Sequence, residues 1–366
     1  MDAIAAVTHA DPYPYYAALA ARPGLFFDDG LKLWIAAGEA GVNAALAHPD
    51  LRVRPAAEPV PAAIAGGGAG QVFGALVRMN DGERHAAPKL VLQRALAGLD
   101  LAAARARAGE LARAGIAAAR GGTRKRPGPG ALSAWMFGVP VQTVASLLGF
   151  RDAQLPQVAA WMGQFVACLS PLSSAEQIAA SHGAALALLD SLKAMLHSSE
   201  AQPGSLLAGV LAEADAAGWN NANAILANLA GLLSQTYEAT AGLVGNGIVA
   251  LLRDPAKAGL PAAVLVENVM RDDPPIQNTR RFAAQAVEVG GARVEAGQAI
   301  LVLLASAARG YGQGAHACPG QALSQAIAAA ALEVLLREGP PARMAWRYRP
   351  SVNARIPEFI EVEESA

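Results

Sequence analysis

The feature of this sequence that most limits its possible folds is a helical pattern that runs without interruption from Asn223 to Arg253. Apolar residues recur there at spacings of three and four, and the stretch is longer than a typical globular helix. Pro255 follows closely and ends the pattern, because proline cannot continue a helix. A helix of this length predicts a central element around which other helices pack.

Most of the remaining chain also predicts helix, because Ala-rich and Leu-rich stretches repeat the same spacings. Strand patterns are few, and the clearest are Lys32 to Ala36, Ala286 to Val289 before a Gly-Gly turn, and Ala299 to Leu304. We therefore expect a mainly α protein with small β-sheets. With 366 residues, 53% of them hydrophobic, the chain can bury a large core as one large domain or as two ordinary ones.

Composition argues against several classes of partner. Lys and Arg number 29 against 30 Asp and Glu, so no overall field attracts nucleic acid or an anionic membrane. The apolar stretches Ala299 to Ala308 and Ala326 to Leu336 are too short or too interrupted to cross a bilayer. The first residues, MDAIAAVTHADPYPYY, lack the basic and apolar regions of a secretory signal, so we expect a cytoplasmic protein.

The two cysteines lie in different surroundings. Cys168 belongs to the apolar helical pattern WMGQFVACLS, which predicts a buried thiol without a chemical role. Cys318 lies in YGQGAHACPG, from Tyr311 to Gly320, directly before a predicted helix from Gln321 to Arg337. A disulfide between the two is disfavoured in a reducing compartment.

The segment around Cys318 is suited to hold a metal-bound sulfur. Free amides at a helix N-terminus and the helix dipole favour a thiolate, while Gly312, Gly314 and Gly320 let the backbone approach a flat ligand. Zinc and iron–sulfur sites need further ligands at short spacing, and neither a second Cys nor a paired His lies there. From the residues alone, a Gly-rich turn with a buried cysteine stays open as the alternative.

A second candidate site lies halfway along the helical stretch from Asn223 to Arg253. Polar side chains gather there in an otherwise apolar element, where they destabilise the fold unless they are paired or used. They are Gln235, Thr236, Glu238 and Thr240.

The segment from Tyr311 to Gly320 resembles the haem-binding signature of cytochromes P450, in which an aromatic residue precedes Gly-x-Gly-x-His/Arg-x-Cys-x-Gly. Every fixed position is met if Tyr311 stands for the usual Phe. Other segments resemble landmarks of bacterial members in the same order: DPYPYYAAL near the start, PVQTVASLLGF at Pro140 to Phe150, LVGNGIVALLRDP at Leu243 to Pro255, and DPPIQNTRRFAAQAVEVGG at Asp273 to Gly291. The resemblance implies a single cytochrome P450 haem domain over residues 1–366, mainly α with small β-sheets, in which the long central helix lies over the haem.

The resemblance also assigns residues to the cofactor, haem b. Cys318 would be the thiolate ligand of the iron. His85 and Lys89, within NDGERHAAPK, would hold a haem propionate, and so would Arg281 and His316. Paired cations are what buried propionates need. The implied cofactor-binding positions are His85, Lys89, Arg281, Tyr311, Gly312, His316 and Gly320.

The sequence departs from the family pattern on the long helix. In the family an acid is followed by a threonine that helps to deliver protons to bound dioxygen. Here the acid is Glu238, the threonine position is Ala239, and Thr240 lies one residue further, about 100° around the helix. Glu238 and Thr240 are therefore the expected proton-relay residues.

Two further departures concern the face where electron donors dock in the family. The Glu-x-x-Arg pair is replaced by Asn268 and Arg271, so a neutral side chain stands where a charged partner is usual. The chain also passes from Gly310 to Tyr311 without the long meander that precedes the haem loop in the family. Both changes predict a remodelled face, and they put a ferredoxin redox partner in doubt.

Three functions are open on these features. The first is haem-thiolate monooxygenation of a small organic substrate, such as a secondary metabolite. The second is a haem-thiolate enzyme that needs no electron donor: a peroxygenase, a dehydratase or an isomerase. The third is a non-catalytic haem-binding or scaffold protein. The expected substrate contacts, in a roomy apolar pocket, are Phe73, Gln235, Thr236, Ile276 and Gln277.

Overall fold

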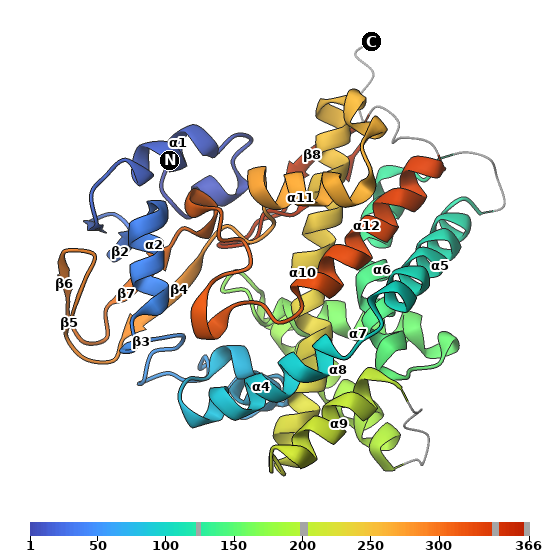
Figure 1. Ribbon diagram of the computed structural model, residues 1–366, viewed down its shortest axis with the longest axis horizontal. Coiled ribbons are helices and arrows are strands. Elements are labelled where there is room, and N and C mark those ends of the chain that lie inside the picture. Colours follow the sequence, from blue (N-terminus) through green and yellow to red (C-terminus); the bar gives the residue numbers. More distant parts are fainter. Residues whose placement is uncertain (122–125, 198–203, 339–343, 362–366) are drawn as a thin grey trace.

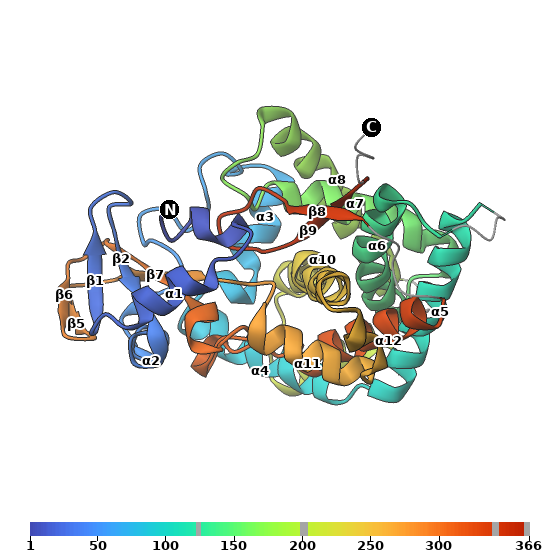
Figure 2. The same cartoon turned by 90° about the horizontal axis from the view of Figure 1, so that it is seen from above.

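The computed structural model describes residues 1–121, 126–197, 204–338 and 344–361. Within these ranges twelve α-helices carry most of the chain, and the nine strands are short. The prediction of a mainly α protein with small sheets is confirmed. Figures 1 and 2 show a helical part built around α10 and, beside it, a sheet that includes strands from the N-terminal region.

The long central helix is α10, Ala222–Arg253, which confirms the predicted range to within a residue. Asn221 caps its start by accepting a hydrogen bond from the amide of Ala224 (3.0 Å), and Pro255 follows its end. Figure 2 looks nearly along its axis and shows it surrounded by other elements. Among the described helices, six pack against it: α3 (Gly68–Ala75), α6 (Pro129–Leu148), α7 (Leu155–Ala167), α8 (Ala175–His197), α11 (Ala262–Asp272) and α12 (Gln321–Arg337).

Glycines on α10 permit the close approach of its neighbours. A Cβ at Gly245 would lie 2.4 Å from Sδ of Met136 on α6, and one at Gly247 would lie 2.7 Å from Cδ1 of Leu332 on α12. Atoms in a close-packed interior do not come this near, so both helices reach α10 only because these side chains are absent.

The remaining helices are α1 (Tyr13–Ala20), α2 (Gly38–Ala47), α4 (Glu83–Ala97), α5 (Leu101–Ala119) and α9 (Leu206–Ala216).

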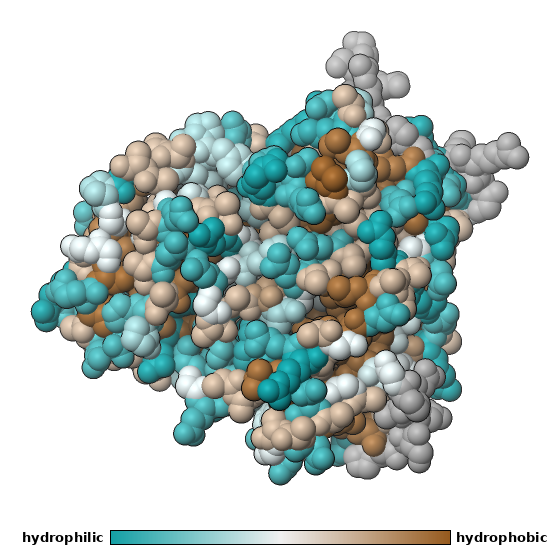
Figure 3. All heavy atoms as spheres, viewed as in Figure 1, coloured by the Kyte–Doolittle hydropathy of each residue, from teal (hydrophilic) through white to brown (hydrophobic). Residues whose placement is uncertain are grey.

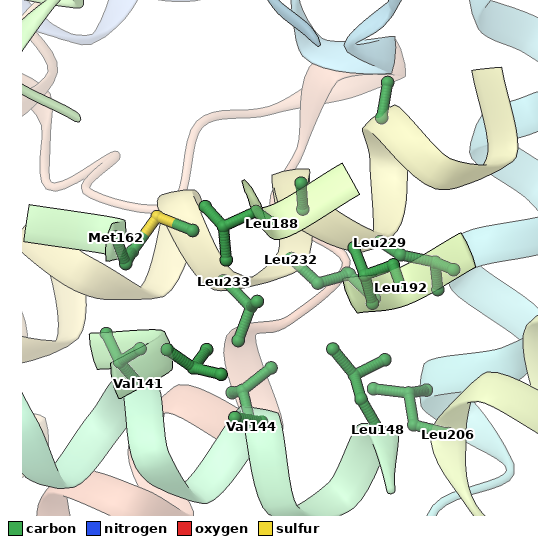
Figure 4. Close-up of a cluster of buried hydrophobic side chains, with 14 of the residues drawn as sticks. Val141, Val144, Leu148, Met162, Leu188, Leu192, Leu206, Leu229, Leu232 and Leu233 are labelled. Carbon is green, nitrogen blue, oxygen red and sulfur yellow. The ribbon is translucent and has the colours of Figure 1, made fainter. Parts of the chain in front are cut away.

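A large apolar cluster holds α10 in place from the side of α6. In Figure 4, Val144 and Leu148 of α6 lie near leucines of α10 and α8, among them Leu229, Leu233 and Leu192. The burial of each side chain of this kind contributes roughly 1.5–3 kcal/mol to the stability of the fold. Cys168 belongs to the same cluster and is buried, as its surroundings predicted.

The helix α6 is apolar over its whole length. Among the described helices it is the one whose length and composition would suffice to cross a membrane, and 56% of that stretch is buried inside the protein. It packs against α5, α7 and α10, and these contacts account for its apolar character.

The main sheet joins segments that are far apart in the sequence. Its strands, in spatial order, are β1 (Leu25–Asp28), β2 (Leu33–Ala36), β7 (Ala299–Val302), β4 (Thr279–Ala283) and β3 (Leu51–Arg52). Strands β2 and β7 pair in parallel, with Ile35 opposite Leu301. The strands predicted at residues 32–36 and 299–304 are thus confirmed, although the second ends at Val302 because a 3₁₀-helix follows.

Two hairpins complete the strands. In the first, β5 (Val287–Val289) pairs with β6 (Ala292–Val294) around a turn at Gly290 and Gly291, both of which have positive φ. This confirms the predicted strand before a Gly-Gly turn. The second hairpin, β8 (Ala345–Tyr348) with β9 (Pro357–Ile360), lies near the C-terminus, and β9 packs against α6 and α10.

Arg355 is a buried cation that connects the two ends of the chain. Its side chain has no accessible surface, and its Nε donates to Oδ1 of Asp273 (2.7 Å), directly after α11. Its terminal nitrogens donate to the carbonyls of Val7, His9 and Ala10 (3.1, 2.6 and 3.0 Å). The N-terminal segment is therefore held by a residue near the other end of the chain.

Hydrogen bonds connect the residues of this ion pair, Arg355 and Asp273, to α10. Nδ2 of Asn246 donates to the carbonyls of Asp273 (2.8 Å) and Arg355 (3.2 Å), and the hydroxyl of Tyr13 donates to the carboxylate of Asp273. The first helix, α10, the end of α11 and the segment before β9 consequently meet at one polar point in the interior.

Asp273→Asn should lower the free energy of unfolding by about 3–5 kcal/mol, because it leaves Arg355 as a buried charge without a counterion. Urea unfolding measures this change. Glu358→Gln is the matched control: Glu358 pairs with Arg347 on the exposed hairpin (2.7 Å), and its loss should change stability by less than about 1 kcal/mol. Similar effects of the two substitutions would contradict the assignment.

Candidate functional site

Cys318 lies in a tight loop directly before α12. Its amide donates to the carbonyl of Tyr311 (2.9 Å), and the amide of Ala317 donates to the carbonyl of Gly314 (3.0 Å). Gly312 and Gly314 both have a φ of +69°, a left-handed conformation that other residues adopt rarely. The glycines of the motif therefore let the loop close on itself and place the sulfur at the start of α12.

The side chain of Cys318 is accessible, in contrast to that of Cys168. Neighbouring protein atoms raise the pKa of Cys318 by desolvation, while the amide of Gly320 and the ammonium of Lys89 act in the opposite direction. The amide at the helix start therefore favours the thiolate, as predicted, and desolvation opposes it. A metal cation at the sulfur would reverse this balance.

A short connection leads from β7 to the Cys318 loop. It consists of the 3₁₀-helix η5 (Leu304–Ala307) and the residues up to Gly310. The guanidinium of Arg309 forms an ion pair with Glu39 of α2 (2.8 Å) and donates to Oε1 of Gln313 in the loop (2.9 Å). In place of a long meander, one arginine fastens the loop to α2.

The residues predicted to hold propionates come to this loop from three elements. His85 and Lys89 are four residues apart on α4 and both are buried, and the alternation of β4 turns Arg281 inward. The rings of His85 and His316, which lies in η6 (Gly314–His316), have centroids 4.1 Å apart. The ammonium of Lys89 donates to the carbonyl of Ala317, beside Cys318. Figure 1 shows α4 passing beside the loop before α12.

Asp81 is a member of this group that the sequence pattern did not reveal. Its Oδ1 lies 3.0 Å from Nε2 of His316, and its Oδ2 accepts from the amide of Val53 (3.0 Å). Burial opposes ionisation of Asp81, but the hydrogen bonds from His316 and Val53 lower its pKa below the ordinary value. The charge of Asp81 also acts on Arg281, which places that guanidinium in the same group. The signal in the sequence was its position four residues before His85.

Two of the residues predicted to hold propionates, His85 and Arg281, have incomplete partners. Nε2 of His85 is buried without a hydrogen-bond partner. Arg281 is 4% exposed and donates to the carbonyl of Arg280 (2.9 Å), and no carboxylate of the described residues lies within 4.0 Å of its guanidinium. Buried cations and imidazoles need such partners. Two propionates would supply them, so these residues fit a haem with its carboxylates at this group and its iron at Cys318.

The middle of α10 is accessible, whereas the helix is buried on either side of it. Gln235 to Ala239 are all partly accessible, and five consecutive residues cover more than one turn of 3.6 residues. Open space therefore borders α10 on more than one side. The side chains of Gln235 and Thr236 donate to carbonyls one turn earlier, at 3.0 and 2.8 Å, so each is satisfied on the helix itself.

Glu238 is an acid on the accessible middle of α10, and the charges of two arginines act on it. Burial raises its pKa, and the charges of Arg349 and Arg78 act in the opposite direction. A carboxyl group with a raised pKa can hold a proton closer to neutral pH. Thr240 is 1% exposed, and Ala239 leaves the family's threonine position without a hydroxyl.

The predicted substrate contacts are placed differently from one another. Phe73 on α3 is 3% exposed, with the guanidinium of Arg54 5.1 Å from its ring centroid. Ile276 is partly buried and forms an isolated bridge with Ala354. Gln277 has no accessible surface, and its Nε2 donates to the carbonyl of Pro274 (2.6 Å). The side chain of Gln277 therefore offers no surface to a ligand.

The altered Glu-x-x-Arg pair lies at the surface of α11. Arg271 donates to Oδ1 of Asn268 (2.9 Å) and pairs with Asp272 (2.8 Å), and its side chain is 62% exposed. The sequence predicted that the buried salt bridge of the Glu-x-x-Arg pair is altered in this chain, and these surface contacts of Arg271 confirm it. Figure 3 shows apolar surface around α11 and α12 on the same side of the molecule, and Val264 of α11 is 38% exposed.

A pocket of about 340 Å³ borders α10 between α6, α7 and β9. Its lining includes Phe137, Tyr237 and Arg349. The ring centroids of Phe137 and Tyr237 are 4.8 Å apart, and the guanidinium of Arg349 lies 4.8 Å from the centroid of Phe137. The sequence did not predict this pocket, because it depends on the C-terminal hairpin folding back on α10.

The haem-free protein should lose stability in acid partly through His85. Burial first, and then the charges of His316 and Lys89, lower its pKa to about 4. Because the folded pKa lies below the ordinary value, this contribution is present above about pH 6.5 and lost as the pH falls toward 4. Urea unfolding at several pH values should show a steeper loss for the native chain than for His85→Gln. Parallel pH curves would contradict the prediction.

Comparisons with known proteins agree with this site. No family model matches the chain. It is 27% identical over 266 residues to Cytochrome P450 107B1 of Saccharopolyspora erythraea, a match that covers 63% of the chain and 64% of that protein. It is 26% identical over 251 residues to Cytochrome P450 monooxygenase PikC of Streptomyces venezuelae, covering 58% and 59%. The chain thus spans less than two thirds of the length of these relatives.

Solved structures match the fold over nearly the whole chain. P450BioI in complex with an acyl carrier protein ligated to hexadec-9Z-enoic acid has a TM-score of 0.80 at 20% identity, covering 95% of this chain and 97% of its own. Epothilone B-bound Cytochrome P450epoK also has a TM-score of 0.80, at 19% identity, covering 96% of both chains. The chain thus has the cytochrome P450 fold, and its sequence relatives are bacterial P450s.

Proposed function

We propose that this chain is a haem-thiolate oxidoreductase that oxidises a small organic molecule, with Cys318 as the ligand of the haem iron. The observation that carries the proposal is the accessible thiol of Cys318 beside a group of buried cations whose acceptors are incomplete. A flat iron complex with two carboxylates matches both features. We propose haem b as this group, held in one domain formed by residues 1–366.

Each part of the site would have a separate task. Cys318 would bind the iron through its sulfur, and His85, Lys89, Arg281 and His316 would hold the propionates by charge-assisted hydrogen bonds. The haem, once bound, supplies the chemistry of oxygen insertion. Glu238 would hold and release a proton at the middle of α10, since burial raises its pKa.

The relatives support an oxidation of this kind. Those matched include a protein named as a monooxygenase and 6-deoxyerythronolide B hydroxylase of Saccharopolyspora erythraea, and one similar structure binds epothilone B. We therefore propose monooxygenation, as hydroxylation or a related oxidation, of a secondary metabolite, and a cytoplasmic location as for bacterial P450s of this type.

A donor-independent reaction, with peroxide as the oxidant, is the second candidate. Ala239 leaves the threonine position without a proton donor, and Arg271 and the short connection through Arg309 change the face where an electron donor would dock. These observations favour an enzyme that does not depend on a ferredoxin.

Cys318→Ala should abolish the thiolate-type absorption of the reduced carbon monoxide complex, because the sulfur ligand is lost. Absorption spectra of the purified, haem-loaded protein measure this. Cys168→Ala is the matched control, since Cys168 is buried away from the loop, and it should leave the spectrum unchanged. An unchanged spectrum in Cys318→Ala would overturn the ligand assignment, and a native chain without haem would overturn the proposed function.

If the second candidate holds, peroxide should support product formation at a rate at least about tenfold above that reached with NADPH, a reductase and a generic ferredoxin. The reason is that a missing proton-transfer group typically lowers a rate by about 10²–10⁴-fold. Product analysis with one substrate under both conditions measures the ratio. Faster turnover with the ferredoxin system would instead assign a conventional monooxygenase.

A further inference from the structure

Arg78 is a partly accessible residue whose charge no described residue neutralises by contact. It is the middle residue of the 3₁₀-helix η2 (Val77–Met79), between α3 and α4. Its Nε has no accessible surface and no hydrogen-bond partner, and the part of the chain that the structure describes provides no ion pair for its guanidinium. A guanidinium stays protonated in proteins and has five N–H donors, so this position calls for an acceptor.

The segment that carries Arg78 is fixed to α10. The amide of Val77 donates to Oδ1 of Asn228 (2.8 Å), and Nδ2 of Asn228 donates to the carbonyl of Ala75 (2.8 Å). Asn228 is 1% exposed, so these bonds are buried and the backbone on both sides of η2 is held in place. The backbone that carries the guanidinium of Arg78 is therefore held against α10.

The groups that act on Arg78 come from α10 and from the end of α7. Burial lowers the pKa of Arg78, while the charges of Glu238 and then Cys168 act in the opposite direction. The carboxyl of Glu238 does not come within 4.0 Å of the guanidinium. Apolar residues also pack around η2, and Phe73, Leu76 and Leu232 lie in the same buried cluster as Val77.

We assign the propionates to residues other than Arg78. The group at His85 is organised around Asp81 and the Cys318 loop, whereas the acid near Arg78 is Glu238. With the propionates at His85, Lys89 and Arg281, the guanidinium of Arg78 still has no acceptor.

We infer that Arg78 binds a carboxylate of the substrate, and that the substrate class of this enzyme is therefore an apolar organic acid with one carboxylate. The inference rests on the proposed function and names its substrate class. A planar guanidinium matches a carboxylate by two parallel hydrogen bonds. A group with two negative charges fits less well, because Glu238 lies nearby and Arg78 offers a single positive charge.

The test compares linear carboxylic acids of increasing length with the primary amide of each. The amide keeps the size and removes the charge. Calorimetric titration of the haem-loaded native protein should show at least one acid bound about tenfold to hundredfold more tightly than its amide. Arg78→Gln and Arg78→Met should remove this preference, while Arg78→Lys should keep part of it. Arg84→Gln, an exposed arginine six residues further on, should keep all of it.

Two results would overturn the inference: native protein for which no acid is preferred at least tenfold over its amide, or a preference that persists in Arg78→Gln and Arg78→Met. Haem uptake is read separately, from the absorption spectrum. Loss of haem binding by the native chain would overturn the proposed function and this inference together, whereas equal binding of acid and amide by haem-loaded protein would overturn the inference alone.

Discussion

The buried ion pair between Arg355 and Asp273 determines how the distant parts of this chain meet. It joins the first residues to the segment before β9, and Asn246 connects both to α10. Asp273 ends α11, and the strand that carries Arg281 begins six residues later. The same contact therefore fixes the long helix, the C-terminal hairpin on its side and one wall of the haem site. Because a buried charge without its partner is strongly unfavourable, these parts form together.

The elements that the sequence predicted well are those with local signals. The helix α10 follows from spacing and a proline, and the Cys318 loop follows from glycines before a helix. Asp81 and Arg78 were missed because their importance arises from contacts with His316 and with the environment of Glu238, far away in the sequence. The direction of the pKa shift of Cys318 could not be predicted from the sequence either, because desolvation depends on tertiary packing.

The departures from the family pattern are tolerated because other arginines make the long-range contacts. Arg271 is exposed, and among the described residues it bonds only Asn268 and Asp272, so it contributes little to the tertiary fold. Arg355 ties the ends of the chain, and Arg309 ties the Cys318 loop to α2. The haem site is thus supported from the sheet and α2, while the surface of α11 is free to differ.

The short connection before the Cys318 loop has a consequence for conformational entropy. A shorter connection has fewer conformations in the unfolded chain, and closing it loses less entropy than closing a long one. Gly310 packs so tightly that a Cβ there would lie 2.6 Å from Cε of Met270, which leaves the folded segment little freedom. The connection therefore brings Cys318 to its folded position at a smaller entropic cost than a long meander would.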